Sequence, residues 1–445
     1  MRSPRMWIAA IGGSLLVWMG APAVPAGSSP VVVSPDTQPV YQAIAAHPMV
    51  QQGVGFLRQD HEATLADQKA IVVIPAPPFK ERVRGEYYQK RLTELGLSNV
   101  AMDSEGNVCG ARAGRGGGPL LLLEAHLDTV FPEGTNVAPV ERDGRLYAPG
   151  IADNARGLAA LLSVVRAFNA TKIRTVGDVL VCGTVGEEGL GDLRGMKTLF
   201  RARRNIAGSV SFDGTSPSRI THLATGSKRY EVTYTGPGGH SFGAFGTPSA
   251  IHAMGRAIAR IGNLETPKSP KTTFTVGTVS GGTSVNSIAA NATMLIDMRS
   301  NSAEELSRLV DRVLPIVQQA ADEENRRWGS TAIQVNTKLV GDRPAGSQSA
   351  DAAIVQAAWM ATRVIGLQPQ LTDASSTNAN LPISVGVPAV TIGSGGNEGR
   401  NHSPDEWFDP KDAYLGPQRA FLTVVGLLGI DGVTPPLLSP APRRP

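Results

Sequence analysis

The chain has 445 residues, and its composition is that of a globular protein, with 41% hydrophobic and 18% charged residues. This length exceeds the size at which single hydrophobic cores usually stop growing, so we expect two domains. The net charge of +4 comes from scattered basic residues, with one small cluster at 201–204. Scattered basic residues are typical of solvated surface and argue against a nucleic-acid-binding protein.

The first 26 residues have the pattern of a secretory signal peptide. Arg2 and Arg5 precede an apolar stretch from Met6 to Met19, and small residues lead to Ala26. Because the apolar stretch is shorter than a full membrane span, cleavage after Ala26 is favoured over an uncleaved anchor. We therefore expect a secreted or periplasmic protein that keeps no stable membrane anchor after cleavage.

Residues 36–225 alternate helical and strand-like patterns and form the first part of the predicted main domain. Apolar spacing predicts two or three helices within 36–69, and a hairpin follows at 100–111. Further helices are predicted at 81–97 and 155–168, and strands at 178–185 and 209–213.

Residues 226–341 follow a different pattern, typical of an inserted α+β unit with an antiparallel sheet. The first pattern resumes over 342–433, and the Pro-rich tail 434–445 is predicted to be disordered. The expected fold is thus an α/β domain with a mixed, mostly parallel sheet flanked by helices, interrupted by a smaller domain. In the insert we predict strands at 229–235, 273–279, 288–299 and 332–339 and helices at 248–261 and 303–323, and after it helices at 350–365 and 413–428 and a strand at 388–392.

Cys109 and Cys182 are the only cysteines, and each lies in an apolar, strand-like context. Export permits a disulfide, but two buried free thiols fit the sequence at least as well. Neither cysteine has a partner at metal-ligand spacing. The sequence leaves their pairing open.

The segment Leu120–Val130 lies at the centre of the main domain. Its apolar run predicts a strand buried on both faces, with His126 and Asp128 at its carboxyl end, where open α/β sheets place their sites. Residues two apart on an extended chain point to the same side, so His126 can ligate a metal while Asp128 orients its imidazole. For this pair alone, a histidine that simply hydrogen-bonds a nearby aspartate is an equal alternative.

Later segments bring more candidate ligands to strand ends and loops. Asp153 precedes a long helix, Glu187 and Glu188 follow a buried strand, Asp213 ends another strand, and His402 lies in a Gly-rich loop. Taken singly, these residues have ordinary interpretations, such as a helix N-cap or solvated loop charge. Taken together, histidine and carboxylate groups suit zinc or a similar divalent ion.

Charge balance favours two ions. If Asp153 bridges them, with His126 and Asp213 on one and Glu188 and His402 on the other, three carboxylates face two divalent cations. The excess of about one positive charge is neutralised by a bridging hydroxide, at a metal separation of about 3.5–4 Å. Glu187 is then free to act as general base.

One alternative is a serine hydrolase. The stretch Gly239–Gly243 fits the G-x-S-x-G pattern, with Ser241 as nucleophile and His402 as its base. A nucleophile elbow needs a strand directly before it and a helix directly after it. Glycines and prolines separate this stretch from both, which disfavours the interpretation.

The chain resembles the M20 metallopeptidases, the family of carboxypeptidase G2, aminoacylase and tripeptidase-like enzymes, from about Ile74 to Phe421. One such motif would be a weak signal, but all of them in order are highly specific. The matching stretches are His126-Leu-Asp128, Gly150-Ile-Ala-Asp153-Asn154, Gly186-Glu-Glu188-Gly, Phe212-Asp213-Gly, Gly239-His240-Ser241, Val285-Asn286-Ser-Ile, Asp342-Arg343-Pro344 and His402-Ser-Pro-Asp-Glu-Trp407.

The resemblance implies a zinc-peptidase fold, the ligand set given above, two Zn²⁺ (with Co²⁺ or Mn²⁺ as substitutes) and Glu187 as base. It implies that the inserted unit is a lid and dimerisation domain, and that His240 stabilises the oxyanion in the partner subunit's site of a homodimer. Asn286 and Arg343 match positions implicated in substrate contact, where a guanidinium suits a carboxylate. The expected activity is hydrolysis of an amide bond in a small peptide or N-acyl amino acid through metal-bound hydroxide.

The chain departs from the tripeptidase-like branch at Asn378, where many relatives have aspartate in a stretch expected to support His402. The competing function is an exported binding protein that keeps the fold without the chemistry. Such a protein would be expected to lose the base or a ligand, and this chain keeps them all. The sequence does not distinguish a dipeptide, a tripeptide, a carboxyl-terminal residue or an acylated amino acid as substrate, nor does it fix the native metal.

Overall fold

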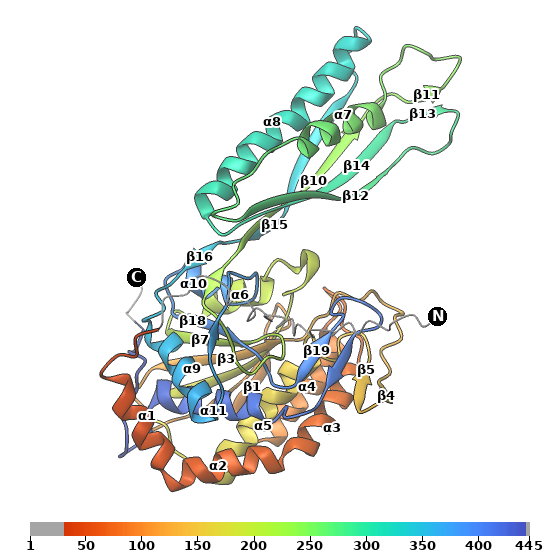
Figure 1. Ribbon diagram of the computed structural model, residues 1–445. Helices are drawn as coiled ribbons and strands as arrows, with labels where there is room; N and C mark the ends of the chain where they lie inside the picture. The colour runs from red at the N-terminus through yellow and green to blue at the C-terminus, as the bar shows by residue number, and fades with distance from the viewer. Residues whose placement is uncertain (1–30, 442–445) are drawn as a thin grey trace, which may run out of the picture. The chain divides into compact units, whose positions relative to one another are not determined.

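The computed structural model describes residues 31–441, so the signal peptide predicted for residues 1–26 lies outside the described residues. An eight-stranded sheet forms the centre of the fold (Figure 1). Four neighbouring pairs are parallel and three are antiparallel, which confirms the predicted mixed sheet. In spatial order the strands are β1 (Ser98–Met102), β2 (Val108–Arg112), β6 (Asp178–Thr184), β3 (Leu120–His126), β7 (Ile206–Phe212), β18 (Ala389–Ile392), β8 (Arg219–Thr221) and β17 (Gln370–Leu371).

Strand β3 is buried on both faces, as its unbroken apolar run predicts. Leu121 and Leu123 pack into the larger core with helix α5 (Ala155–Thr171), whereas Leu122 packs into a second core with helix α6 (Arg194–Ala202). Helices thus cover both faces of the sheet. The others are α1 (Thr37–Ala46), α2 (Pro48–Gln59), α3 (His61–Val72), α4 (Arg82–Glu94), α9 (Ala353–Val364), α10 (Asn380–Ser384) and α11 (Leu415–Leu428).

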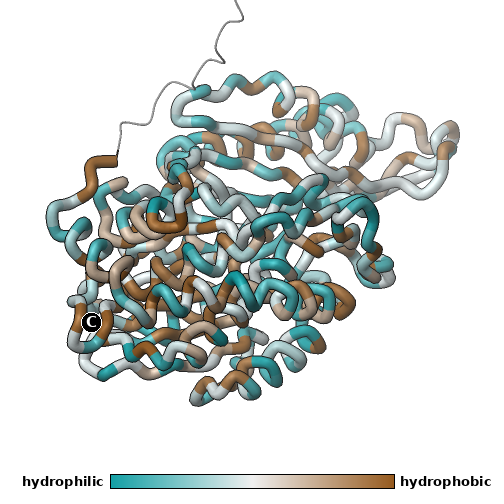
Figure 2. The backbone as a smooth tube through the Cα atoms, turned by 60° about the horizontal axis from the view of Figure 1, so that its bottom comes forward, coloured by the Kyte–Doolittle hydropathy of each residue, from teal (hydrophilic) through white to brown (hydrophobic). Residues whose placement is uncertain are grey.

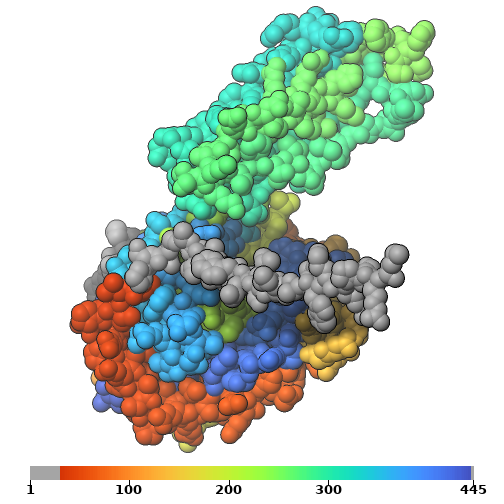
Figure 3. All heavy atoms as spheres, viewed as in Figure 1, coloured from red at the N-terminus to blue at the C-terminus, as the bar shows by residue number. Residues whose placement is uncertain are grey.

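The two ends of the described chain pack together. Figure 3 shows the red and orange amino-terminal helices beside the blue carboxyl-terminal ones, and α1 and α2 both contact α11. Figure 2 shows hydrophobic and hydrophilic positions alternating along the helical turns, as amphipathic helices on a sheet require. No helix within residues 31–441 combines the length and apolar character that a membrane crossing needs.

The inserted segment has a four-stranded antiparallel sheet and a hydrophobic core of its own. Its last strand runs to Arg343, two residues beyond the predicted end at 341. The sheet order is β12 (Thr272–Gly281), β14 (Asn291–Ser300), β10 (Gly226–Thr235) and β15 (Gln334–Arg343), packed with α7 (Ala250–Gly262) and α8 (Ala303–Arg327).

A second four-stranded sheet lies in the main domain, in the order β19 (Asn397–Gly399), β20 (Trp407–Asp409), β5 (Arg145–Tyr147) and β4 (Val140–Arg142). The remaining strands of the described residues form two short pairs, and a 3-10 turn, η1, spans Gly189–Gly191. The short pairs are β11 (Gly239–His240) with β13 (Ser287–Ile288) and β9 (Leu223–Ala224) with β16 (Gly346–Ser347).

Two features differ from or add to the sequence interpretation. The predicted disorder of the tail is wrong for residues 434–441, because Leu438 is buried in the main core and its N–H donates to Leu427 O. Residues 442–445 lie outside the described residues. Cys109 and Cys182, whose pairing the sequence left open, are directly opposed on β2 and β6 and form a disulfide.

Candidate metal centre

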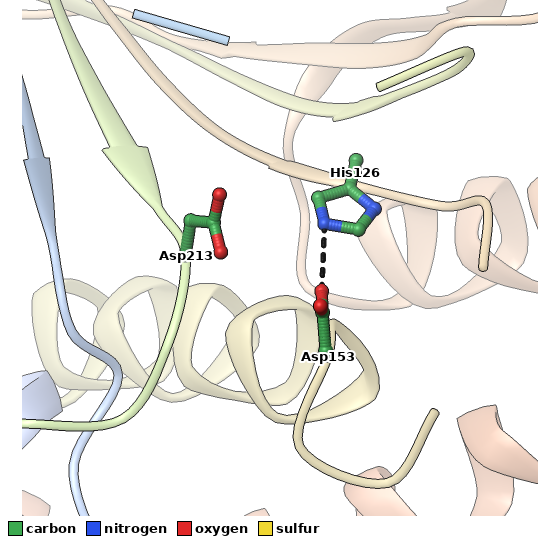
Figure 4. A group of neighbouring side chains, drawn as sticks. All are labelled: His126, Asp153 and Asp213. Carbon is green, nitrogen blue, oxygen red and sulfur yellow. Dashed lines mark ion pairs between the residues drawn. The ribbon is translucent and has the colours of Figure 1, made fainter. Parts of the chain in front are cut away.

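His126 ends strand β3 with its ring held in one orientation. Its Nδ1 lies 2.9 Å from the backbone carbonyl oxygen of Asp128, and its Nε2 lies 3.0 Å from Asp153 Oδ1 (Figure 4). An Nδ1–H that donates to the carbonyl leaves a lone pair on Nε2, directed at Asp153. The ring is buried, so Nε2 faces the carboxylate rather than water.

The predicted role of Asp128 needs correction, because its backbone rather than its carboxylate orients the imidazole. The carboxylate instead accepts hydrogen bonds from the amides of Glu187 (3.1 Å) and Glu188 (2.7 Å). Asp128 Oδ1 lies 3.7 Å from His126 Nδ1, outside hydrogen-bond distance. Asp128 therefore fixes the loop after β6 through its carboxylate and the His126 ring at the end of β3 through its carbonyl.

Asp153 lies in the loop that enters α5 but is not the helix cap. Asn154 takes that role, with its side-chain oxygen accepting from Gly157 N at 3.1 Å and its amide donating to Phe212 O at 2.7 Å. The amides of Ala152 and Asp153 both donate to the buried carboxylate of Glu406. The Asp153 side chain is thereby left to face the histidines.

The structure brings all five predicted ligands into groups in which donor atoms lie within 4.8 Å of one another. One group joins His126, Asp153 and Asp213, and another joins Asp153, Glu188 and His402. His402 Nε2 is 3.1 Å from both Asp153 Oδ2 and Glu188 Oε1. Asp153 thus belongs to both groups, which is the arrangement that the charge count predicts for a bridging carboxylate.

Several carboxyl groups are buried close together in this cluster, and burial and their mutual repulsion shift pKa values within the cluster. Burial and the neighbouring Asp153 carboxylate raise the pKa of Asp213 to about 7. Hydrogen bonds to Asp153 and Glu188 raise the pKa of His402 to about 10. Both shifts mean that the cluster attracts positive charge, either as protons or as metal ions.

The residues fit divalent ions. Asp153 Oδ1 is buried and accepts no hydrogen bond of good geometry, although a ring nitrogen lies 3.0 Å away. A ring nitrogen and a carboxylate oxygen that face each other at this distance are the two kinds of donor that a shared cation requires. The mixture of imidazole and carboxylate donors suits zinc.

Glu187 also lies beside His126 and Glu188, but it has a cationic partner of its own. Arg343 Nη1 donates to its Oε1 at 3.0 Å and to Ser376 Oγ at 3.1 Å, and both charged groups are buried. Burial raises the pKa of Glu187 well above its ordinary value, against the opposing effect of Arg343. The Glu187–Arg343 pair joins two segments 156 residues apart, which the spacing of neither motif indicates.

Asn378 does not support His402 as expected. Its amide donates to Glu124 Oε2 (2.8 Å) and to Thr184 Oγ1 (3.0 Å) in the buried interior of the main sheet. Glu124 is fully buried, and burial raises its pKa. A neutral amide at 378 therefore matches a buried carboxyl at 124.

The structure does not bring His240 and Asn286 to the cluster in a single chain. Both line a cavity of about 510 Å³ between β11 and the loop before β13, where His240 is exposed. Ser241 follows a strand of only two residues, and the next helix after it, α7, begins only at Ala250. The geometry of a nucleophile elbow is absent there, and the serine-hydrolase alternative is wrong.

Sequence reasoning missed Glu406 as a site residue. Its carboxylate accepts from the amides of Gly150 (3.2 Å), Ala152 (2.9 Å) and Asp153 (3.1 Å). Burial and the Asp153 charge raise its pKa to about 7. The only available signal was its place in the matching stretch that begins at His402.

Imidazole and carboxylate groups gathered at the carboxyl ends of the main sheet suit a metal centre, and the comparison with known sequences identifies the family. Residues 122–419 match the model of peptidase family M20/M25/M40, so the chain belongs to this family. The predicted family is confirmed, and the protein is a hydrolase of the amidohydrolase type. A binding protein without the chemistry is no longer a competing interpretation.

Individual relatives agree with the family match. The succinyl-diaminopimelate desuccinylase of Nitrosospira multiformis is 26% identical over 330 residues, which cover 70% of this chain and 84% of that protein. Carboxypeptidase G2 of a Pseudomonas species is 28% identical over 227 residues, covering 48% and 54%. A tripeptidase from Staphylococcus aureus shares the fold, with a TM-score of 0.68 at 22% identity over 82% of this chain and 97% of that one.

Proposed function

We propose that the protein is a co-catalytic di-zinc hydrolase that cleaves an amide bond in a small peptide or an N-acyl amino acid. The observation that carries the proposal is the place of Asp153 in two ligand groups at once. Similarity to a desuccinylase and a carboxypeptidase supports both substrate classes. When bound, two divalent cations would polarise the scissile carbonyl and acidify the attacking water.

The residues of the chain then have separate tasks. His126 and Asp213 would hold one cation, Glu188 and His402 the other, and Asp153 both. Glu187 would take a proton from the attacking water and deliver it to the leaving amine, because its carboxylate lies beside the ligands without being needed as one. Arg343 keeps Glu187 oriented and shares its charge.

The experiment is a panel of dipeptides, tripeptides, carboxyl-blocked peptides and N-acyl amino acids, with products read by mass spectrometry. Turnover should disappear after treatment with a chelator and return with zinc, and elemental analysis should give about two metal ions per chain. Turnover that is indifferent to the chelator, or one ion per active chain, would contradict the proposal.

We also propose that the protein is exported and acts as a homodimer through the inserted segment. Export is supported by the pattern of residues 1–26 and by the Cys109–Cys182 disulfide, since disulfides persist in oxidising compartments. Dimerisation is supported by the family resemblance and by the exposed His240, which belongs to none of the candidate ligand groups of its own chain.

A complementation experiment tests the role of His240 across subunits. His240→Ala chains and Glu187→Gln chains should each be inactive, whereas an equal mixture should recover up to about a quarter of the wild-type activity, because half the dimers are mixed and each mixed dimer has one intact site of two. Activity is measured after the two variants are unfolded and refolded together. Mixtures no more active than their parents would remove the proposal of a histidine donated in trans.

A further inference from the structure

The outer face of the sheet β19-β20-β5-β4 is basic and aromatic, while its inner face is apolar. Leu146 and Phe408 point into the main core and are buried. Their neighbours Arg145, Tyr147 and Trp407 point the opposite way, because successive residues of a strand alternate between faces. Tyr147 and Trp407 are directly opposed on β5 and β20, so their rings share the outer face.

Two arginines are brought together on this face by a tight hairpin. Arg142 and Arg145 are cross-strand partners on either side of the two-residue turn Asp143-Gly144, in which both residues have positive φ (52° and 73°). Like charges directly opposite in an antiparallel pair destabilise it. Within residues 31–441, no carboxylate forms an ion pair with either of them.

Aromatic rings hold both guanidinium groups in place. The Arg142 guanidinium carbon lies 4.4 Å from the centre of the Tyr147 ring, and that of Arg145 lies 4.3 Å from the Trp407 ring. Trp407 in turn packs over Gly399, where an added Cβ would lie 2.4 Å from the indole. Stacking uses one face of each guanidinium and leaves its N–H groups free to donate in the plane.

A third arginine completes a cavity of about 410 Å³, lined by Arg142, Arg145, Tyr147, Arg400, Asp405 and Trp407. Arg400 forms an ion pair with Asp405 at 2.8 Å. Three guanidinium groups and one carboxylate leave the lining with two unbalanced positive charges. A ligand group with two negative charges would neutralise them.

We propose that this cavity binds a dianionic group, either a phosphate or a dicarboxylate, between the guanidinium groups of Arg142 and Arg145. Planar guanidinium groups bind such oxyanions through paired hydrogen bonds, and binding relieves the repulsion between the two arginines. The loop 400–406 between β19 and β20 contributes Arg400 and Asp405 to the cavity and also carries His402, two residues from Arg400. The dianionic group belongs either to a separate small ligand or to the far end of the substrate of the neighbouring centre.

The test measures binding of inorganic phosphate to the zinc-loaded enzyme by calorimetry at constant ionic strength. Phosphate can also reach the zinc ions, so the informative quantity is the difference between wild type and Arg142→Gln/Arg145→Gln. One saturable site should weaken about tenfold or more in this variant. The control Arg308→Gln/Arg312→Gln removes two charges from an exposed face of α8 and should bind phosphate as the wild type does.

Equal phosphate affinity in the wild type and both variants would overturn the proposal. An equal loss of affinity in both variants would also overturn it, because the loss would then follow from the change in net charge alone. Two matched amide substrates, one with a neutral and one with a dianionic far end, identify the source of the group. If the variant loses only the KM advantage of the dianionic substrate, the group belongs to the substrate. If phosphate binding is lost while both KM values are unchanged, a separate ligand is indicated, and both results support the site.

The binding measurement requires no turnover, so its failure is distinct from failure of the proposed hydrolase function. Turnover of the neutral substrate should be unchanged in Arg142→Gln/Arg145→Gln, because neither arginine contacts the proposed zinc ligands or Glu187. That measurement shows that the variant is folded.

Discussion

The Asp153 carboxylate owes its position to the residues on both sides of it. The amide before it and its own amide are bound by Glu406, and the next side chain, Asn154, is held by the start of α5 and the end of β7. Its backbone is thus fixed before any ion binds. A carboxylate held in this way would lose little conformational entropy on binding a cation, which favours a preformed centre.

Glu187→Gln is the sharpest test at the scale of a single residue. The amide keeps the size of the side chain but cannot take a proton, so kcat should fall by about 10²–10⁴-fold. Zinc content should remain that of the wild type, because Glu187 is not needed as a ligand. The measurements are steady-state kinetics and elemental analysis on the same preparation.

Glu188→Gln is the matched control, since it alters the adjacent carboxylate, which we place among the ligands. Zinc stoichiometry should drop in this variant. Loss of zinc in Glu187→Gln, or full zinc in Glu188→Gln, would show that the two roles are assigned the wrong way round.

Asn378→Asp should destabilise the protein, because it places a second carboxylate 2.8 Å from Glu124 in a buried site. The two groups cannot both ionise there, and we expect a loss of about 1–3 kcal/mol in the free energy of unfolding. The double variant Glu124→Gln/Asn378→Asp restores one carboxylate and one amide and should recover most of the loss. Urea unfolding measures all three, and a double variant no better than Asn378→Asp would argue against a matched pair.

The sequence predicted which residues gather at the site where a motif fixes their positions. It did not predict contacts with residues far away in the sequence. The clustering of the five candidate ligands follows from strand-end positions and motif spacing. The hydrogen bonds of Asp128 to the loop after β6, the Glu187–Arg343 pair and the Glu124–Asn378 pair depend on segments between 59 and 254 residues apart. Nothing in local sequence spacing encodes such distances.

At the scale of elements, the disulfide joins β2 and β6, an antiparallel pair at one side of the sheet. It closes a loop with a sequence separation of 73 residues, so it restricts the unfolded chain strongly. Cys109→Ala/Cys182→Ala should lower the free energy of unfolding by about 2–5 kcal/mol. Urea unfolding is measured with and without a reductant.

The reductant separates the effect of the bond from that of side-chain loss. Wild type should lose stability on reduction, whereas the double variant should be insensitive to it. A wild type equally stable in both conditions would show that the bond contributes nothing measurable.

The long elements were predicted and the shortest ones were not. Helices such as α5 and α8 and strands such as β3 and β14 carry periodic apolar patterns that the sequence displays directly. Strands β8, β9, β16 and β17 have two or three residues each, too few to show a period of two, and they form only because a neighbouring backbone offers hydrogen bonds. The tail was misjudged because its prolines hid the burial of Leu438.

At the scale of the whole molecule, the metal-free protein should lose stability between pH 5 and pH 8. Burial and Asp153 raise the pKa values of Asp213 and Glu406 to about 7, so the unfolded state releases these protons first as pH rises. Hydrogen bonds to Asp153 and Glu188 raise the pKa of His402 to about 10, so its stabilising contribution is also lost as pH rises above the ordinary value. Both effects lower the Tm of the metal-free protein as the pH rises.

Zinc bound at the proposed centre would replace the missing positive charge, so its effect on the Tm should be larger at pH 8 than at pH 5. Thermal unfolding of chelator-treated and zinc-loaded protein across this range measures both quantities. A metal-free Tm that rises from pH 5 to pH 8 would contradict the pKa directions given above.

Strand β15 links the inserted segment directly to the candidate metal centre. Its final residue, Arg343, contacts Glu187, the proposed base, while its other end is in the inserted segment. A shift of that segment along the strand would pull the guanidinium away from Glu187 and make the carboxylate a stronger proton acceptor. A movement of the insert on substrate binding would in this way raise the proton affinity of Glu187 through strand β15 alone.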